Sequence, residues 1–464
     1  MIEIPLEVKN DMTETHDIGA GTSRSEESKV EDKSGSWMLR LATDQKMLKL
    51  SALVALALLM HIWAAVFLAI DTSSDRSRLF GLIGMAFFVL LMTVISADRS
   101  KIKWRTCAWG FFVHFCLGLL CLRWTLGAIV FQKFAETTVK FLELTNYGSE
   151  FVYGFLSKPP PICEMDPVLV FSGEAALLIR PYLEKQTSSE LHAIMASGFS
   201  CIAGALFAAY VSFGACPKYL LSSSVMSAPA SLAFAKIMFP ENEESHSRKV
   251  SDLDLPPSEE NNPIECISNG AMGGLHIVVA IAANLVSVLA LLALVNSILF
   301  YLGDLIGYAP WSLENFLQYM LFPVAYVMGV TGDVQETLAV ARLIATKTAV
   351  NEFVAYRNLG ELISHQPPQL SPRSAMIATY ALCSFSNLCT VGIAMGVLGS
   401  MVPSKRHVLA RVVFRALICG CVCTLYTASL AGVLVSEPLL CRPSTAAMSC
   451  FNVTRAVNTS SLML

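Results

Sequence analysis

The sequence predicts an all-α, polytopic membrane protein, and three observations carry this prediction. Hydrophobic residues make up 54% of the 464, whereas charged residues make up only 15%. Apolar stretches that approach or exceed the roughly 20 residues of a membrane-spanning helix recur along the chain. Lysine and arginine gather beside several of these stretches, as is typical of cytoplasmic loops. The net charge of −3 gives no indication of a nucleic-acid partner.

The N-terminal residues 1–48 are predicted to form a cytoplasmic tail. Residues 1–38 are polar and contain no apolar stretch that would make a signal peptide. Several acids interrupt this segment and favour a solvated tail: Glu26, Glu27, Glu31 and Asp32.

Residues 49–153 are predicted to hold the N-terminal membrane helices. Three apolar stretches at 52–70, 79–97 and 106–122 are candidate spans. The amphipathic segment 135–144 is typical of a helix that lies in the membrane interface. Basic residues before the first span and between the second and third place both segments inside the cell: Arg40, Lys46, Lys49, Arg99, Lys101, Lys103 and Arg105.

Residues 154–436 are predicted to form the membrane core of the protein, with a polar loop at 241–264. The uncharged runs 191–217 and 374–404 have centres rich in glycine or small polar residues. Such centres favour broken helices whose freed backbone groups line a protein cavity, although a tightly packed helix interface would have the same composition. The run 266–303 is either one long tilted helix or two segments broken near Gly273 and Gly274.

The C-terminal residues 437–464 are predicted to form an extracellular tail. A basic cluster precedes the uncharged run 416–436, which places that side of the last helix inside the cell. Asn452 and Asn458 begin glycosylation sequons and agree with an outside location. Cys441 and Cys450 lie in this tail, where a disulfide could form if it is extracellular. A cytoplasmic N-terminus and an extracellular C-terminus require an odd number of spans.

Two carboxylates, Glu174 and Glu352, lie in apolar surroundings. A charge at the centre of a bilayer costs roughly 3 kcal/mol or more, so an acid there usually binds something. Asn387 and Thr390 are three residues apart and would face the same side of a helix. Carboxylates accept hydrogen bonds and an asparagine amide both donates and accepts. This set fits a neutral, hydroxyl-rich solute better than an anion, which would require arginine or lysine.

Each acid also has an alternative explanation as one half of an ion pair. Glu352 could pair with Lys347 or Arg357, and Glu174 could pair with Arg180.

No enzyme motif is found in the chain, so we expect a binding or transport protein without a cofactor. The sequence contains no His-Glu-x-x-His pair, no phosphate-binding glycine loop and no nucleophile elbow. Most of the 14 cysteines lie in apolar runs without metal-ligand spacing and are expected to act as small hydrophobic residues.

Several sequence blocks together resemble one known family. They run over residues 174–182, 189–195, 202–204, 212–214, 224–230, 323–330, 351–356, 377–383 and 399–403. With these blocks the chain resembles the concentrative nucleoside transporters, which are sodium-coupled carriers, over most of residues 101–435. The resemblance implies an inverted-repeat core in which two re-entrant hairpins meet two broken helices around the nucleoside, and a homotrimeric assembly.

The resemblance also implies roles for individual residues. Glu174 would face the base at the tip of the first hairpin, and Glu352 would bind the ribose from the second hairpin. Asn387 and Thr390 would lie near the ribose in the second broken helix. The coupling sodium ion would contact positions that correspond to Val170, Cys201 and Ile202, and Cys383 occupies a position linked to cation coupling.

The chain departs from the family pattern around the first hairpin. Pro167 stands where the family has a sodium-binding asparagine, and Cys201 stands where it has a hydroxyl residue. Phe171 and Ser172 match no usual variant of the first tip, so the preference for purines or pyrimidines is not predicted. The segment 154–174 is shorter than in the family, so the first hairpin is predicted to be truncated.

Two functions follow as expectations. The first is a sodium-coupled nucleoside symporter of the plasma membrane, a glycoprotein that contacts lipids and works by alternating access. The second is a transport-deficient variant that serves as a structural or regulatory partner of full-length paralogues.

Overall fold

The structure is a computed structural model that describes residues 66–73, 75–143, 180–202, 206–245, 262–307, 311–330 and 333–443. The chain divides into two units, residues 1–74 and 75–464. In the first unit the described residues are helical from 66 to 71. Everything that follows concerns the second unit.

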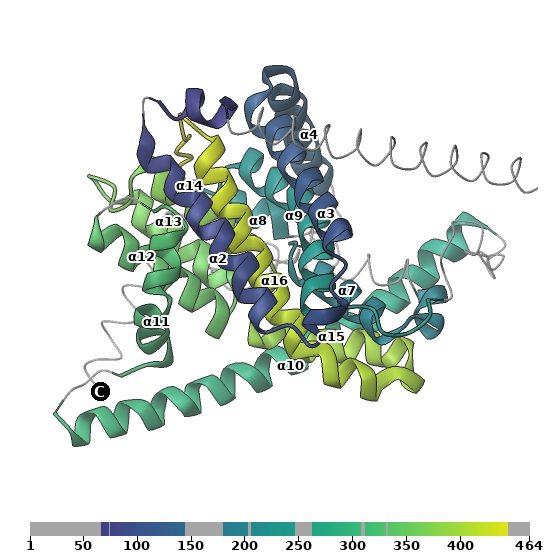
Figure 1. The fold of residues 1–464 in the computed structure, drawn as a ribbon. Coiled ribbons are helices and arrows are strands. Elements are labelled where there is room, and N and C mark those ends of the chain that lie inside the picture. The colour runs from purple at the N-terminus through teal and green to yellow at the C-terminus, as the bar shows by residue number, and fades with distance from the viewer. Residues whose placement is uncertain are drawn as a thin grey trace, which may run out of the picture. The chain divides into compact units, whose positions relative to one another are not determined.

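The described residues of the second unit form helices and contain no β-strand, as the sequence predicts (Figure 1). In chain order they are η1 (Arg76–Leu79), α2 (Phe80–Val94), η2 (Arg99–Lys101), α3 (Trp104–Gly118), η3 (Leu119–Arg123), α4 (Thr125–Glu143), η6 (Arg180–Lys185), α7 (Ser188–Phe199), α8 (Phe207–Ser212), α9 (Pro217–Met238), α10 (Pro263–Leu305), α11 (Leu313–Val327), α12 (Val334–Ala349), α13 (Glu352–Ser364), α14 (Pro372–Leu382), α15 (Leu388–Met401), η9 (Pro403–Lys405) and α16 (Arg406–Leu434).

Four helical segments of the described part are long and apolar enough to cross a membrane: Arg76–Val94, Trp104–Arg123, Pro217–Met238 and Pro403–Leu434. The first, second and fourth overlap the predicted spans 79–97, 106–122 and 416–436. Most of the predicted span 52–70 lies outside the described residues.

Helix α9 is a candidate span that the hydropathy pattern did not predict. It contains five serines and begins with Pro217 and Lys218, which hide its apolar character. The free-energy cost of burying these serine hydroxyls is offset because the hydroxyls bond to carbonyls of the same helix. Ser222 donates to the carbonyl of Lys218 at 2.7 Å, and Ser224 donates to that of Leu220 at 3.1 Å.

Both predicted broken helices are broken. In the run 191–217, α7 ends at Phe199, α8 begins at Phe207, and residues 203–205 lie outside the described part. In the run 374–404, α14 ends at Leu382 and α15 begins at Leu388. The interruption falls within the small polar segment Ser384–Asn387, where side chains compete with the helix for backbone hydrogen bonds.

Helices α12 and α13 form a hairpin with a two-residue turn, Val350 and Asn351. Their 16 and 13 residues correspond to lengths of about 24 and 20 Å, which are short of the roughly 30 Å of a bilayer core. These lengths agree with the predicted re-entrant hairpin. Helix α11 packs against α12 and precedes it in the chain.

Helix α16 is central to the second unit and packs against α2, α7, α9, α14 and α15. Figure 1 shows it beside α2, and every residue from Cys423 to Leu434 is buried. The contact with α7 depends on Gly420, because a Cβ atom there would lie 2.6 Å from the Cβ of Phe199. Gly420 therefore allows α16 to approach the residue at which α7 ends.

The described residues bear on three further predictions. Helix α10 is continuous for 43 residues, so the run 266–303 is one long helix and is not broken at Gly273 and Gly274. Residues 135–143 of the amphipathic segment belong to the longer helix α4, and the place of the segment in the membrane interface stays a prediction. Cys441 does form a disulfide, and its partner is Cys216 at the start of α9.

Candidate functional site

The tip of the α12–α13 hairpin places Glu352 inside the protein. Asn351 is the N-cap of α13, and its side chain accepts a hydrogen bond from the backbone N–H of Val354 at 2.9 Å. Asparagine is among the best N-cap residues, so the Asn351-Glu352 pair fixes where the helix begins. Glu352 is only 3% exposed. The acid lies in the first turn of α13, where the helix dipole stabilises negative charge.

Both carboxylate oxygens of Glu352 accept hydrogen bonds from other elements. The amide nitrogen of Asn387 donates to Oε2 at 2.7 Å, and the hydroxyl of Tyr210 donates to Oε1 at 3.2 Å. Asn387 comes from the break between α14 and α15, and Tyr210 comes from α8. Glu352 thus joins the hairpin to both broken helices.

The alternative explanation of Glu352 as half of an ion pair is not realised. Among the described residues it forms no ion pair with Lys347 or Arg357. Its hydrogen-bond partners are instead the neutral side chains of Asn387 and Tyr210.

Asn387 and Thr390 form a capping box at the start of α15. The backbone N–H of Thr390 donates to the side-chain oxygen of Asn387 at 3.0 Å, and the backbone N–H of Asn387 donates to the hydroxyl oxygen of Thr390 at 3.2 Å. This reciprocal pair satisfies two helix-end donors. It also turns the amide nitrogen of Asn387 toward Glu352. The structure therefore brings together three of the four predicted substrate residues.

Tyr210 is a site residue that sequence reasoning missed. Its ring stacks on Tyr356 with a centroid distance of 4.4 Å, and the Tyr356 hydroxyl donates to the carbonyl of Thr379 at 2.8 Å. Both tyrosines are 0% exposed. The only available signal was a tyrosine inside a broken apolar run, and the sequence does not tell which way that ring points.

The residues predicted to take part in cation coupling, where the structure describes them, lie in or beside the two breaks. Cys201 and Ile202 follow the end of α7, and Cys383 follows the end of α14. The breaks touch, because the backbone N–H of Phe385 donates to the carbonyl of Cys201 at 3.1 Å. The thiol of Cys201 donates to the carbonyl of Ser197 at 2.9 Å, and that of Cys383 donates to the carbonyl of Leu220 at 3.6 Å.

The donor set around the first break suits an alkali cation better than a transition metal. Unwound carbonyls and helix C-terminal ends are the groups that coordinate Na⁺ in broken-helix carriers, and the Cys201–Ile202 backbone follows such an end. The described residues contain no cluster of three or more histidine, cysteine or acidic side chains that could hold a metal.

Several predicted residues cannot be placed. Glu174, Val170, Asn452 and Asn458 lie outside the described residues, as does Pro167.

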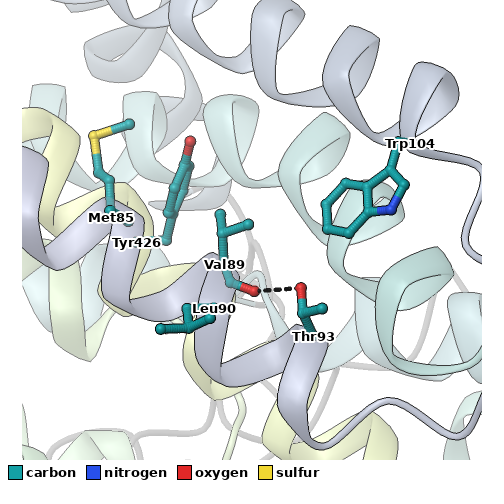
Figure 2. A pocket seen from close by; sticks show the side chains of 7 residues that line it. Met85, Val89, Leu90, Thr93, Trp104 and Tyr426 are labelled. Carbon is teal, nitrogen blue, oxygen red and sulfur yellow. Dashed lines mark hydrogen bonds between the residues drawn. The ribbon is translucent and has the colours of Figure 1, made fainter. Parts of the chain in front are cut away.

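An open apolar groove lies away from these residues, on α2, α3 and α16 (Figure 2). Val89, Leu90, Trp104 and Tyr426 are among the side chains that line it. One of its polar side chains, Thr93, donates to the carbonyl of Val89 at 2.8 Å, within the same helix. The lining of this groove includes none of Glu352, Asn387 and Thr390, so it is not the site that the predicted residues form.

The family now follows from sequence comparison. The N-terminal domain of the Na⁺ dependent nucleoside transporters matches residues 83–156, and the C-terminal domain matches residues 219–432. Solute carrier family 28 member 3 of Eptatretus stoutii is 34% identical over 468 residues, covering 88% of this chain and 68% of that relative. The chain belongs to the Na⁺ dependent nucleoside transporter family. The family predicted from the sequence is therefore confirmed.

Other relatives agree. The chain is 35% identical to human solute carrier family 28 member 3, covering 87% of this chain and 67% of that protein. It is 36% identical to sodium/nucleoside cotransporter 1 of Oryctolagus cuniculus, covering 80% and 65%. The chain thus spans about two thirds of the length of these relatives. All of them are named as transporters and not as enzymes.

Solved structures of this family share the fold. The inward-facing, substrate-bound structure of CNTnw superposes with a TM-score of 0.66 and 28% identity, covering 77% of this chain and 98% of CNTnw. An outward-facing structure of a CNTnw variant superposes equally well, with a TM-score of 0.66. The likeness confirms the predicted all-α, polytopic transporter fold, and the family's function confirms the predicted class, sodium-coupled nucleoside transport by alternating access.

Proposed function

We propose that this chain is itself a sodium-coupled nucleoside symporter in which Glu352 binds the ribose. The observation that carries the proposal is the 2.7 Å hydrogen bond between Asn387 and Glu352 across the hairpin and the second break. A carboxylate accepts from vicinal hydroxyls, and an amide both donates and accepts. Thr390 holds Asn387 in place, so the three residues form one neutral-solute site with a single negative charge.

We also propose which residues contact the base of the nucleoside and the coupling sodium ion. Glu174 faces the base. Val170, Cys201 and Ile202 contact the coupling sodium ion, and Cys383 influences that coupling. The position of Cys201 and Ile202 just beyond the end of α7 supports this assignment, because unwound backbone after a helix end is where sodium is expected to bind.

We also propose a plasma-membrane location with the C-terminus outside and the protein assembled as a homotrimer. The disulfide between Cys216 and Cys441 supports the orientation, because disulfides persist on the oxidising side of a membrane. In this orientation the start of α9 and the residues after α16 lie on that side. Asn452 and Asn458 are then available for glycosylation. The exposed apolar side chains of α2, including Ile83 and Leu90, support contact with lipid.

Uptake of labelled uridine tests the proposal. Cells that express the chain are assayed in sodium and in choline medium, with Glu352→Gln as the test variant and Glu361→Gln on the same helix as the matched control. We expect sodium-dependent uptake to fall about 100-fold or more for Glu352→Gln, since hydrogen bonds to a charged acceptor contribute about 1.5–3 kcal/mol each. The control variant is expected to retain uptake. Full uptake by Glu352→Gln would remove Glu352 from the site.

A second function is favoured by one observation of the sequence. Pro167 offers no side-chain ligand where the family has an asparagine, so the chain could be a transport-deficient partner of full-length paralogues. In that case the unmutated chain would give no more uptake than empty cells and would co-purify with a full-length paralogue.

A further inference from the structure

Lys347 is a completely buried cation close to the site. It lies in the last turn of α12, five residues before Glu352, and its side chain is 0% exposed. Lysine is almost never fully buried unless it is paired. Yet it forms no ion pair with any carboxylate among the described residues. The charge of Glu352 attracts it from beyond ion-pair distance.

The ammonium group of Lys347 is bound to the end of a different helix. It donates to the carbonyl of Ala381 at 2.7 Å, to the hydroxyl of Ser384 at 2.5 Å and to that of Thr424 at 3.4 Å. Ala381 lies in the last turn of α14, where carbonyls have no partner within the helix. A cation at a helix C-terminus interacts favourably with the helix dipole. Lys347 therefore caps α14 from outside.

The contact continues toward the nucleoside residues through hydroxyl groups. The Ser384 hydroxyl is 2.8 Å from that of Ser386 and 3.3 Å from that of Thr424. Ser386 is the residue before Asn387, whose amide donates to Glu352. All of Ser384, Ser386 and Asn387 are buried. A short path of buried polar atoms thus runs from the ammonium group to the residue that meets the carboxylate.

The two charges of the hairpin contact the two sides of one break. Lys347 binds the C-terminal end of α14, and Glu352 binds the N-cap of α15. Both contacts agree with the helix dipoles. A dipole favours a cation at the C-terminus of a helix, as at α14, and an anion at the N-terminus, as at α15.

We propose that Lys347 is a positioning residue of the nucleoside site, which holds the break between α14 and α15 so that Asn387 meets Glu352. This inference rests on the proposed function where it concerns the nucleoside. Its structural part concerns the break alone. The two parts are tested by separate measurements.

Hydrogen exchange on the purified full chain tests the structural part. Lys347→Met removes the cation and keeps the volume, and we expect the amides of residues 384–390 to exchange at least about 10-fold faster. The matched control is Lys236→Met, because Lys236 also donates to a serine, Ser189 at 2.8 Å, and pairs with Glu241 away from the site. That variant is expected to leave exchange in 384–390 unchanged. Equal exchange in Lys347→Met and in the unmutated chain would overturn the inference.

Ser384→Ala keeps the test decisive if Lys347→Met does not fold. It removes one acceptor of the ammonium group and the link to Ser386, so exchange in 384–390 is expected to rise about 3-fold. In the double variant, exchange is expected to be no faster than in Lys347→Met alone, because both changes interrupt one path. Unchanged exchange in Ser384→Ala, or fully additive effects, would contradict the proposed path.

Binding of uridine and 2′-deoxyuridine tests the functional part. We expect Lys347→Met to raise the Kd for uridine about 10-fold and to reduce the ratio of the two Kd values. A merely structural role would lower the folded fraction without moving that ratio, so an unchanged ratio contradicts positioning. If the unmutated chain binds neither compound, the proposed function fails, whereas the exchange measurement still decides whether Lys347 holds the break.

Discussion

The two broken helices of this protein are interrupted in chemically different ways. At the second break, side chains replace the lost helix bonds: Asn387 and Thr390 cap α15, and Lys347 caps α14. At the first break, α8 begins at Phe207, its N-cap residue Leu206 makes no side-chain cap, and the carbonyl of Cys201 accepts from the N–H of Phe385. Where the structure describes the two breaks, the second has a capping box and a buried cation at its helix ends, and the first has neither.

This difference indicates how the two halves of the core divide the work. A site of fixed amide and carboxylate groups can select a hydroxyl-rich solute by hydrogen-bond geometry. Main-chain carbonyls at a helix end suit a cation, which requires oxygen and little directionality. Tyr210 is the exception, because α8 in the first half contributes its hydroxyl to Glu352.

Asn387→Ala is expected to have the largest effect on the second break. It removes an N-cap, worth about 1 kcal/mol, and a hydrogen bond to a charged group, worth about 1.5–3 kcal/mol. Sodium-dependent uridine uptake should fall about 100-fold. Asn262→Ala, which removes the N-cap of α10 outside the site, is the control and should retain uptake. Similar losses in both variants would mean that capping alone matters.

Tyr210→Phe tests the link between the two halves. It deletes one donor to Glu352 and keeps the ring stacked on Tyr356. Losing one hydrogen bond to a charged group, about 1.5 kcal/mol of binding free energy, predicts a KM for uridine about 10-fold higher, with the maximal rate little changed. Tyr219→Phe is the matched control, because the Tyr219 hydroxyl accepts from the N–H of Leu439 and, among the described residues, does not bond to Glu352. An unchanged KM in Tyr210→Phe would show that the first half takes no part in binding the solute.

Cys201→Ser tests the first break and has the smallest expected effect. The hydroxyl restores the kind of oxygen ligand that hard cations prefer. We expect the sodium concentration for half-maximal uptake to fall about 3-fold, with the uridine KM unchanged at saturating sodium. Cys421→Ser on α16 serves as the control. A shift in uridine KM without a shift in sodium dependence would contradict the division between the breaks.

The sequence predicted much of the second half of the core and less of the first. The segment from Ser384 to Thr390 predicted a break in the helix, because its small polar residues compete for the helical hydrogen bonds. The family resemblance predicted Glu352 and Asn387 as substrate residues. Helix α9 was not predicted as a membrane span, because serine counts as a polar residue in a hydropathy pattern. In the fold, the hydroxyls of Ser222 and Ser224 bond to the preceding turn of the helix.

Other features depend on long-range geometry that no local pattern carries. Tyr210 meets Glu352 across 142 residues, and Cys216 pairs with Cys441 across 225. The sequence proposed Lys347 as an ion-pair partner of Glu352. The fold instead turns its ammonium group to the end of α14, because an unsatisfied helix carbonyl and two hydroxyls are gathered there.

Whether Glu352 binds the ribose is tested most directly by removing the two ribose hydroxyls from the substrate and the carboxylate from the protein. Kd values for uridine and for 2′,3′-dideoxyuridine are measured on the unmutated chain and on Glu352→Gln. If Glu352 binds the ribose hydroxyls, the unmutated chain should prefer uridine by about 10-fold or more, the value of one hydrogen bond to a charged group. Glu352→Gln should lose most of that preference. The same preference in both proteins would contradict the assignment of Glu352 to the ribose.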